Sequence, residues 1–438
     1  MTETLNQVLE RGHPEAVAIA TPGGGPCLTY AQLRQEVASA ADLLAGLGLR
    51  RQDRIALVLP NSIETIVMFL AAATAGVAAP LNPAYKESEF RFYLEDTGAR
   101  ALVVPPGGGE AARRALGPDA ITIEAKTDLA GKVELQTSAQ SARAAMAAGP
   151  EGDDVALVLH TSGTTSRPKQ VPLRQRNLAA SAANIAATYR LTPDDVAMCV
   201  MPLFHIHGLM ASTMATFHSG GTVVVPPGFD AMAFWPAVAE HRASWYSAVP
   251  TMHQMLLLRN RGERPAGAEG LRFIRSSSSA LPPEVMRQLE SRFGSPVLEA
   301  YGMTEASHQM ASNPLPPGER KAGTVGVATG ISIGVMDENG SLQSTGGQGE
   351  VVIQGSTVID AYANDAEANA KSFTDGWFRT GDQGLLDASG YLSLVGRLKE
   401  MINRGGEKIS PREIDDVLLQ HPAVAEAVAF GTPHPRWG

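Results

Sequence analysis

The sequence has few of the features that mark secreted, fibrous or nucleic-acid-binding chains. Its 438 residues include only two cysteines, Cys27 and Cys199, which form no CxxC or zinc pattern. We expect both to be buried free thiols in a reducing compartment. Aromatic residues make up 5%, and 45 acidic residues against 36 basic ones give a net charge of −9. That charge argues against a broad nucleic-acid-binding surface.

Long apolar segments are also lacking. The N-terminus has no apolar core typical of a signal peptide. The longest apolar run, 66–81, is Ala-rich and is broken by Thr74, Gly76 and Pro80. A buried helix leading into a strand explains it better than a membrane span. We therefore expect a cytoplasmic protein, a monomer or a homodimer, with neither a nucleic acid nor a membrane as partner.

The remaining composition is that of a globular α/β protein. Hydrophobic residues make up 44%, and the length suits roughly three domains of about 150 residues each. Helical and strand patterns alternate, which favours parallel sheets covered by helices on both faces. We expect a helix over 30–47 that Thr29 caps, and a surface segment over 106–152. The other predicted helices are 63–75 and 175–189, and the predicted strands are 54–59, 101–104, 155–160 and 222–225.

The strongest chemical signal is the run TSGTTSRPK at 161–169. It follows a predicted strand and precedes a predicted helix that opens near Arg174. Hydroxyls, a flexible glycine and a terminal Lys169 are suited to holding phosphate oxygens, because backbone N–H groups and hydroxyls bond them and the ammonium neutralises their charge. The run is not the P-loop of nucleotide triphosphatases, and an ordinary polar turn is the alternative.

Three weaker motifs follow. The run EAYGMTE at 299–305 supplies an aromatic ring, a hydroxyl and a carboxylate, which could stack a base, contact a phosphate and hold Mg²⁺. The run TGD at 380–382, followed by GRLKE at 396–400, offers partners for ribose hydroxyls, although a simple turn has the same sequence. The run RGGEKISP at 404–411 is a glycine-rich loop before a predicted helix.

The four motifs in this order resemble the adenylate-forming superfamily of acyl-CoA synthetases, aryl-CoA ligases, luciferases and peptide-synthetase adenylation domains, over nearly the whole chain. The resemblance implies ATP-dependent activation of a carboxylate to an acyl-AMP, followed by transfer to coenzyme A. It also implies an α/β fold. We expect an N-terminal domain at 1–397 of mixed, largely parallel sheets covered by helices, with a β-rich subdomain at about 323–397. The start of a small, mobile α+β C-terminal domain would occupy 398–438.

The resemblance assigns a role to each motif residue. Tyr301 would stack on adenine, Thr304 would contact the α-phosphate, and Glu305 would help to place Mg²⁺. Asp382 and Arg397 would bind the ribose. The β- and γ-phosphates would be held by Thr161, Ser162, Gly163, Thr164, Thr165 and Lys169.

Some positions depart from the family pattern, and others belong to its mobile C-terminal part. Ser166 and Gln170 stand where glycine is usual, and nothing in the sequence explains Gln170. Lys399 occupies the hinge position of the family. The lysine that members carry near their C-terminus to drive adenylation has no counterpart before Gly438, so we expect a truncated chain.

Substrate choice depends on the acyl pocket. The run MPLFHIHG at 201–208 resembles the pocket-entry motif of the family, in which His205 fits the recurrent catalytic histidine and His207 takes a tunnel-lining position. The run RSSSSAL at 275–281 falls where a glycine pair usually forms the pocket floor. Together with His308, these groups disfavour a long apolar tail, which would leave them unpaired. They favour a short, polar or doubly charged acid, which a protonated histidine would bind more strongly.

Within the superfamily, several runs resemble the oxalyl-CoA synthetases, among them HTSGTTSRPK, PLFHIHGL and the continuation of the TE motif at 303–316. That resemblance maps the oxalate contacts to Ser278 and His308, with His207 nearby, while Gly302 and Ser277 depart from the expected pattern. A ligase for another short acid such as malonate, or a small aromatic or branched one, is the alternative. A nucleotide-binding chain without full activity is another. A phosphotransferase would lack its expected motif and would release ADP.

Overall fold

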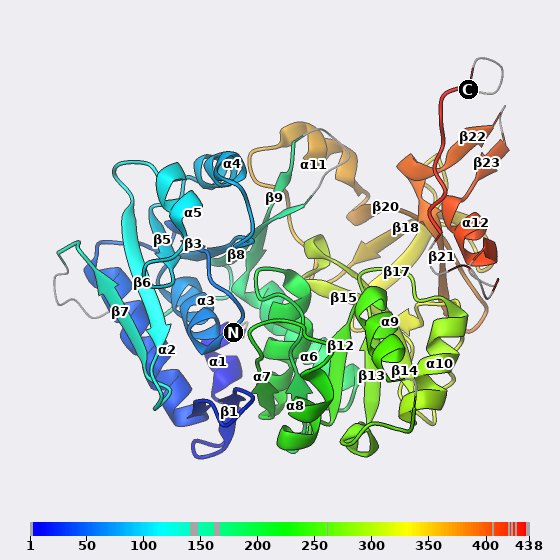
Figure 1. The fold of residues 1–438 in the computed structure, drawn as a ribbon. Coiled ribbons are helices and arrows are strands. Elements are labelled where there is room, and N and C mark those ends of the chain that lie inside the picture. The colour runs from blue at the N-terminus through cyan, green and yellow to red at the C-terminus, as the bar shows by residue number, and fades with distance from the viewer. Residues whose placement is uncertain are drawn as a thin grey trace.

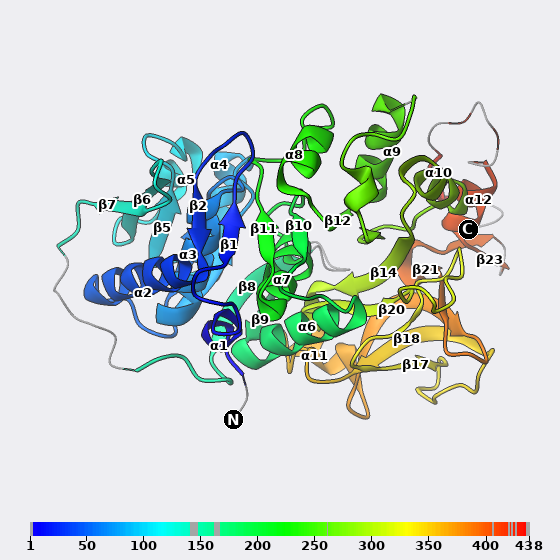
Figure 2. The same ribbon diagram turned by 90° about the horizontal axis from the view of Figure 1, so that it is seen from below.

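The computed structural model describes residues 3–140, 148–161, 167–260, 262–404, 407–418, 421, 424 and 427–434. Three sheets follow one another across the molecule (Figure 1). The seven-stranded sheet lies on the blue and cyan side, the nine-stranded sheet, which includes the blue strands β1 and β2, lies in the middle, and the five-stranded sheet lies toward the C-terminal side (Figures 1 and 2).

The seven-stranded sheet has the order β7-β6-β5-β3-β4-β8-β9. Strands β3 to β6 and β8 pair in parallel, and β7 and β9 pair antiparallel at the two edges. Its strands are β3 (Arg54–Leu57), β4 (Val77–Pro80), β5 (Ala101–Val104), β6 (Ile121–Thr127), β7 (Val133–Thr137), β8 (Val155–Thr161) and β9 (Lys169–Arg174). The helices in this part of the chain are α2 (Tyr30–Gly46), α3 (Ile63–Ala75), α4 (Glu87–Thr97) and α5 (Glu110–Ala115).

The nine-stranded sheet has the order β16-β15-β14-β13-β12-β10-β11-β1-β2. Its strands are β1 (Val17–Ala20), β2 (Cys27–Thr29), β10 (Val196–Met198), β11 (Thr222–Val224), β12 (Trp245–Ala248), β13 (Phe273–Ser276), β14 (Val297–Met303), β15 (His308–Ser312) and β16 (Val327–Ala328). The accompanying helices are α1 (Leu5–Leu9), α6 (Gln175–Thr188), α7 (Ala215–Ser219), α8 (Phe234–His241), α9 (Pro250–Arg259) and α10 (Pro283–Phe293). A π-helical segment, η1 (His207–Met214), runs into α7, and the short 3₁₀ turns are η2 (Ala268–Gly270) and η3 (Thr304–Ala306).

The five-stranded sheet is antiparallel, with the order β17-β18-β20-β19 and β21 paired to β20. Its strands are β17 (Ser332–Met336), β18 (Gln348–Gln354), β19 (Phe373–Thr374), β20 (Trp377–Leu386) and β21 (Leu392–Arg397), with α11 (Ala366–Ser372) between β18 and β19. The chain then enters η4 (Leu398–Glu400), a ribbon of β22 (Ile402–Arg404) and β23 (Glu407–Ile409), and α12 (Pro411–Leu418). This last part projects at one end of the molecule (Figure 1).

Local sequence signals explain where the main elements begin. The Thr29 side chain accepts from the backbone of Gln32 and the Gln32 side chain bonds back, so α2 starts with a capping box as predicted. Ser62 caps α3 by accepting from the backbone N–H of Thr65, and α3 is buried along nearly its whole length. The apolar run at 66–81 is therefore a core helix followed by strand β4, as its sequence indicated. Among the described residues, no helix is long and apolar enough to cross a membrane.

Two expectations from the sequence were wrong, whereas the helix expected to open near Arg174 is confirmed as α6, with Arg174 as its N-cap. The segment 106–152 contains α5, β6 and β7, and the two strands form an edge of the seven-stranded sheet instead of a surface segment. Cys27 is exposed on the edge strand β2, and only Cys199 is buried; both are free thiols.

Candidate active site

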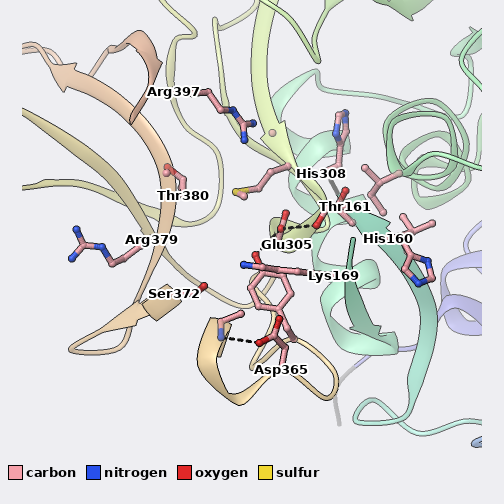
Figure 3. A pocket seen from close by; sticks show the side chains of 18 of the residues that line it. His160, Thr161, Lys169, Glu305, His308, Asp365, Ser372, Arg379, Thr380 and Arg397 are labelled. Carbon is pink, nitrogen blue, oxygen red and sulfur yellow. Dashed lines mark hydrogen bonds between the residues drawn. The ribbon is translucent and has the colours of Figure 1, made fainter. Parts of the chain in front are cut away.

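A cavity of about 650 Å³ opens between the ends of strands from all three large sheets. Figure 3 shows that Lys169, Glu305 and Thr161 face one side of this space, while Arg379, Thr380 and Arg397 line the opposite side. The lining includes nine of the residues singled out from the sequence: Thr161, Lys169, His205, Ser278, Thr304, Glu305, His308, Arg397 and Lys399. Three further predicted residues do not line the cavity: Tyr301, Asp382 and His207. The part of the predicted phosphate loop at 162–165 lies outside the described residues.

Glu305 is the meeting point of one group of side chains in this cavity. Its Oε1 atom accepts from the Thr161 hydroxyl at 3.3 Å and from the Tyr362 hydroxyl at 2.8 Å. The Lys169 ammonium lies over the Tyr362 ring, 4.6 Å from its centroid, which is a favourable cation–π geometry. Burial and the adjacent Glu305 raise the pKa of Tyr362, so its hydroxyl stays protonated and donates. Tyr362 thus positions both the cation and the carboxylate.

A second group joins β14 to the five-stranded sheet. The Tyr301 hydroxyl donates to Oδ2 of Asp382, and Nε of Arg397 lies 3.0 Å from the other carboxylate oxygen. The backbone supports this pair, because Asp382 and Arg397 stand opposite each other in the antiparallel register of β20 and β21. Burial raises the pKa of Asp382, and Arg397 opposes that shift. The carboxylate and the guanidinium lie together at the Arg397 side of the cavity.

Gln170 has a clear structural explanation that the sequence did not provide. Its side-chain amide donates to Oδ2 of Asp96 on α4 at 2.7 Å and also to the Asp96 backbone carbonyl. The same carboxylate bonds Nε2 of His160 at 3.0 Å and pairs with Arg167. Burial alone would raise the pKa of Asp96, but the hydrogen bonds from Gln170, His160 and Arg167 lower it below its usual value. Both ends of the 161–169 loop are therefore tied to α4.

Ser278 and His308 both line the cavity, and both have unusual backbone conformations. Ser278 has a φ of 72° and His308 a φ of 101°, which cost free energy for residues that carry a Cβ. The Ser278 hydroxyl lies 3.0 Å from Nδ1 of His207, and the His207 and His308 rings stack with centroids 4.8 Å apart. Nε2 of His308 is buried and has no hydrogen-bond partner among the described residues. A buried polar atom without a partner needs an explanation, and a ligand bound at this site would provide one.

The histidines around this end are neutral. Burial lowers the pKa of His207 and of His308 well below the usual value, and Arg275 lowers both further. Burial also lowers the pKa of His205, whose Nδ1 accepts from the backbone N–H of His207. A protonated imidazole is therefore not the group that would bind an anion here, as the sequence had allowed. The positive charge belongs to Arg275, which is fully buried on β13.

Sequence reasoning missed four residues of this arrangement: Arg275, Ser247, Tyr362 and Asp96. Arg275 did leave a signal, because a charged residue stands inside the apolar strand run FIRS. The serines that follow it are the residues that the pattern assigned to the pocket floor. The other three leave no signal in their own segments, since each acts on a residue distant in the chain.

A family model described as AMP-binding enzyme matches residues 7–363. The chain belongs to this AMP-binding family. A "Probable CoA ligase CCL9" of Humulus lupulus is 49% identical, covering 94% of this chain and 80% of that protein. An oxalate–CoA ligase of Arabidopsis thaliana is 44% identical, covering 100% and 87%. A sulfoacetate–CoA ligase of Cupriavidus necator is 38% identical, covering 97% and 84%.

Solved structures of similar fold agree with the family assignment. The ATP-bound MatB of Rhodopseudomonas palustris aligns with a TM-score of 0.88 at 32% identity, over 99% of this chain and 86% of that one. The α/β architecture of mixed sheets covered by helices, with a β-rich unit toward the C-terminus, is therefore confirmed for this AMP-binding enzyme. The boundary expected at residue 397 between a large and a mobile domain stays a prediction.

Proposed function

We propose that this protein, an AMP-forming acid–CoA ligase, activates oxalate to oxalyl-AMP with ATP and transfers the oxalyl group to coenzyme A. The observation that carries the proposal is that Ser278 and His308 both line the cavity, while the buried Nε2 of His308 has no partner among the described residues. A long apolar acyl chain would leave both groups without partners, at a cost of about 1–3 kcal/mol each. A second carboxylate would satisfy them.

The opposite end of the cavity suits ATP. Lys169 and Thr161 would bind the phosphate oxygens that leave as pyrophosphate, together with residues 162–165 of the same loop. Asp382 would accept hydrogen bonds from the ribose hydroxyls, with Arg397 holding its carboxylate in place. Tyr301 would pack against adenine, and Thr304 would contact the α-phosphate.

A magnesium ion fits the chemistry of this end. Mg²⁺ is commonly held by one or two carboxylates together with substrate phosphates, and Glu305 is a carboxylate beside the predicted phosphate site. No group of three or more acidic, histidine or cysteine side chains among the described residues forms a complete metal cage, so phosphate oxygens would complete the coordination. Bound there, the ion would neutralise charge on the departing pyrophosphate.

The residues of the chain would promote the first half-reaction mainly by position. Ser278 and His308 would hold one carboxylate of the acid, which leaves the other directed toward the α-phosphorus of ATP. Its oxygen attacks that phosphorus, the bond to the bridging oxygen breaks, and pyrophosphate leaves with its charge balanced by Lys169. Fixing two reactants in line and stabilising the developing charge account for the rate enhancement.

The second half-reaction would place the thiol of coenzyme A at the acyl carbon, with AMP leaving. Lys399 lines the cavity and lies in η4, directly after the strand that carries Arg397. We propose this turn as the hinge between the domain at 1–397 and the mobile part at 398–438. His205 would sit beside the carboxylate that becomes the thioester.

The acids that compete most directly with oxalate as the proposed substrate are also doubly charged or short. The sulfoacetate–CoA ligase relative supports sulfoacetate as a second candidate, because a sulfonate presents oxygens to the same donors. The test is AMP release from ATP and coenzyme A with oxalate, sulfoacetate, malonate, acetate, hexanoate and coumarate. Oxalate should give the highest kcat/KM, and another acid giving a higher value would overturn the assignment.

Variants link the activity to the pocket. Ser278→Gly removes the hydroxyl and tolerates the φ of 72°, and His308→Ala removes the free imidazole nitrogen. Each should lower kcat/KM for oxalate about 10- to 100-fold, since a hydrogen bond to a charged group is worth about 1.5–3 kcal/mol. Ser279→Ala, an exposed neighbour outside the cavity, is the matched control. ATP binding without AMP release for any acid would favour a non-catalytic nucleotide-binding role.

A further inference from the structure

Arg275 is a buried cation without an anionic partner. Its side chain has no exposed surface, and among the described residues its guanidinium bonds only neutral groups. Nε donates to the Tyr189 hydroxyl at 2.9 Å, Nη2 to Oε1 of Gln309 at 3.0 Å, and Nη1 to the Ser247 hydroxyl at 3.0 Å. Among the described residues, no carboxylate forms an ion pair with it, whereas Arg272 on the same segment pairs with Asp195 at 2.6 Å.

The cost of such a charge calls for an explanation. Arginine does not lose its proton in proteins, so it cannot avoid the free-energy cost of a buried charge by becoming neutral. An unpaired charge in the interior is expensive, and proteins normally pair it with an acid. The chain instead places this cation one side chain, His207, away from Ser278, which lines the acyl cavity, where a substrate anion can balance the charge.

The hydrogen bonds that begin at Arg275 have only one possible direction. A guanidinium can only donate, so the Ser247 oxygen accepts from Nη1. The Ser247 hydrogen then points to Nε2 of His207, 2.6 Å away, which also lies 3.3 Å from Nη1. His207 is neutral, so its single proton is on Nδ1 and is donated to the Ser278 oxygen. The Ser278 hydrogen is left to point into the cavity.

His308 adds a second consequence of the same charge. Its ring stacks on His207, its side chain is 2% exposed, and it lines the cavity. The Arg275 charge disfavours protonation of both rings. A neutral imidazole keeps one N–H donor, and the buried Nε2 of His308 has no partner among the described residues.

We infer that Arg275 is a positioning residue that makes this cavity selective for acids with a second negative charge. It acts through Ser247 and His207, which fix Ser278 as a hydrogen-bond donor, and its own unbalanced charge stabilises the bound dianion. Chains of oriented hydrogen bonds polarise one another, so the effect exceeds that of an isolated serine. The inference rests on the proposed function in one respect, namely that the acid occupies the Ser278 end of the cavity.

The test compares two acids of equal size that differ by one charge. Oxalate is a dianion, and oxamate, its monoamide, is a monoanion of nearly the same shape. Arg275→Met should lower the ratio of kcat/KM for oxalate to that for oxamate about 10- to 100-fold, mainly through KM for oxalate, with KM for ATP unchanged. Arg275→Lys should retain part of the ratio, because it keeps the charge but cannot reach both neighbours in the same geometry.

Further variants separate positioning from structural support. Ser247→Ala leaves Arg275 in place but breaks the directed chain, so it should lower the ratio severalfold and be non-additive with Arg275→Met. Arg272→Met, which removes a paired arginine, should leave the ratio unchanged. Calorimetric binding of both acids in the presence of α,β-methylene-ATP repeats the comparison without turnover. If Arg275→Met does not fold, Ser247→Ala and Arg275→Lys decide.

An equal loss for both acids in Arg275→Met would overturn the inference, as would a wild-type enzyme that prefers monoanions to every dianion. One further outcome distinguishes failure of the oxalate proposal from failure of the inference about Arg275. If sulfoacetate is preferred to oxalate, the oxalate proposal fails, and the same variants are measured with sulfoacetate against acetate. A reduced ratio there would still support Arg275 as the origin of charge selectivity.

Discussion

The Lys169 ammonium lies over the ring of Tyr362, and the hydroxyl of the same ring donates to Glu305 at 2.8 Å. One aromatic side chain thus holds the cation and the carboxylate that face the predicted phosphate site. The two contacts use different parts of the ring, so they can be removed separately.

Tyr362→Phe keeps the ring beneath Lys169 and removes the hydrogen bond to Glu305. We expect ATP–pyrophosphate exchange to slow about tenfold, with a higher magnesium concentration needed for half-maximal rate, because a lost hydrogen bond to a carboxylate costs about 1.5–3 kcal/mol. Tyr362→Leu should slow exchange further, because it also removes the cation–π contact with Lys169, which contributes about 0.5–2 kcal/mol. Equal rates for Phe and wild type would show that Glu305 needs no such support.

Gln170 should couple energetically to Asp96. Gln170→Ala is expected to lower the free energy of unfolding by about 1–3 kcal/mol, because it leaves the Asp96 carboxylate one donor short. It should also raise KM for ATP, since the 161–169 loop loses an attachment to α4. The measurement is urea unfolding of the single and double variants with Asp96→Ala.

The double variant should be less destabilised than the sum of the two single ones. Gln136→Ala, an exposed glutamine on β7, is the control and should show additive behaviour with Asp96→Ala. If the effects of Gln170→Ala and Asp96→Ala on the free energy of unfolding are also additive, the contact with Asp96 does not explain why Gln170 stands where the family has glycine.

Stability should fall as the pH falls below about 6.5. Burial lowers the pKa of His253 to about 4, so the folded state keeps it neutral while the unfolded state takes up a proton. The unfolded state binds more protons between these two pKa values, and this residue alone therefore removes about 3 kcal/mol of stability as the pH falls through that window. Urea unfolding between pH 7.5 and 5 measures the slope.

His253→Gln should make that slope shallower, whatever its effect at pH 7.5. The matched variant His13→Gln changes an exposed histidine. Its slope should equal that of the wild type, and an identical slope for His253→Gln would contradict the assignment.

The two cysteines should react very differently. Cys27 is exposed, whereas burial raises the pKa of the Cys199 thiol to about 11. Because the thiolate is the reactive form, iodoacetamide at pH 8 should label one thiol in the folded protein and both after denaturation. Mass spectrometry of the labelled peptides identifies the site, and Cys27→Ser should abolish the native-state labelling.

Local patterns in the sequence were sufficient for much of the fold. The helices α2, α3 and α6 and the strands β3, β5, β8 and β11 follow from apolar periodicity and capping residues, which depend on neighbours a few positions away. The segment 106–152 was misjudged because its Ala- and Gly-rich composition resembles a surface loop. Its strands β6 and β7 are stabilised by pairing at the edge of a sheet.

The features of the candidate site also divide into those that the sequence predicts and those that only the tertiary structure reveals. The sequence by itself determined the family, and it predicts the ATP-binding motifs and the polar character of the acyl pocket, since each depends on a contiguous run such as that at 299–305. Only the tertiary structure decided that His207 acts from behind Ser278, that Gln170 holds Asp96, and that the unpaired charge is Arg275. These contacts join residues 28 to 74 positions apart, and hydrogen-bond direction and burial arise only when the strands that carry them are brought together.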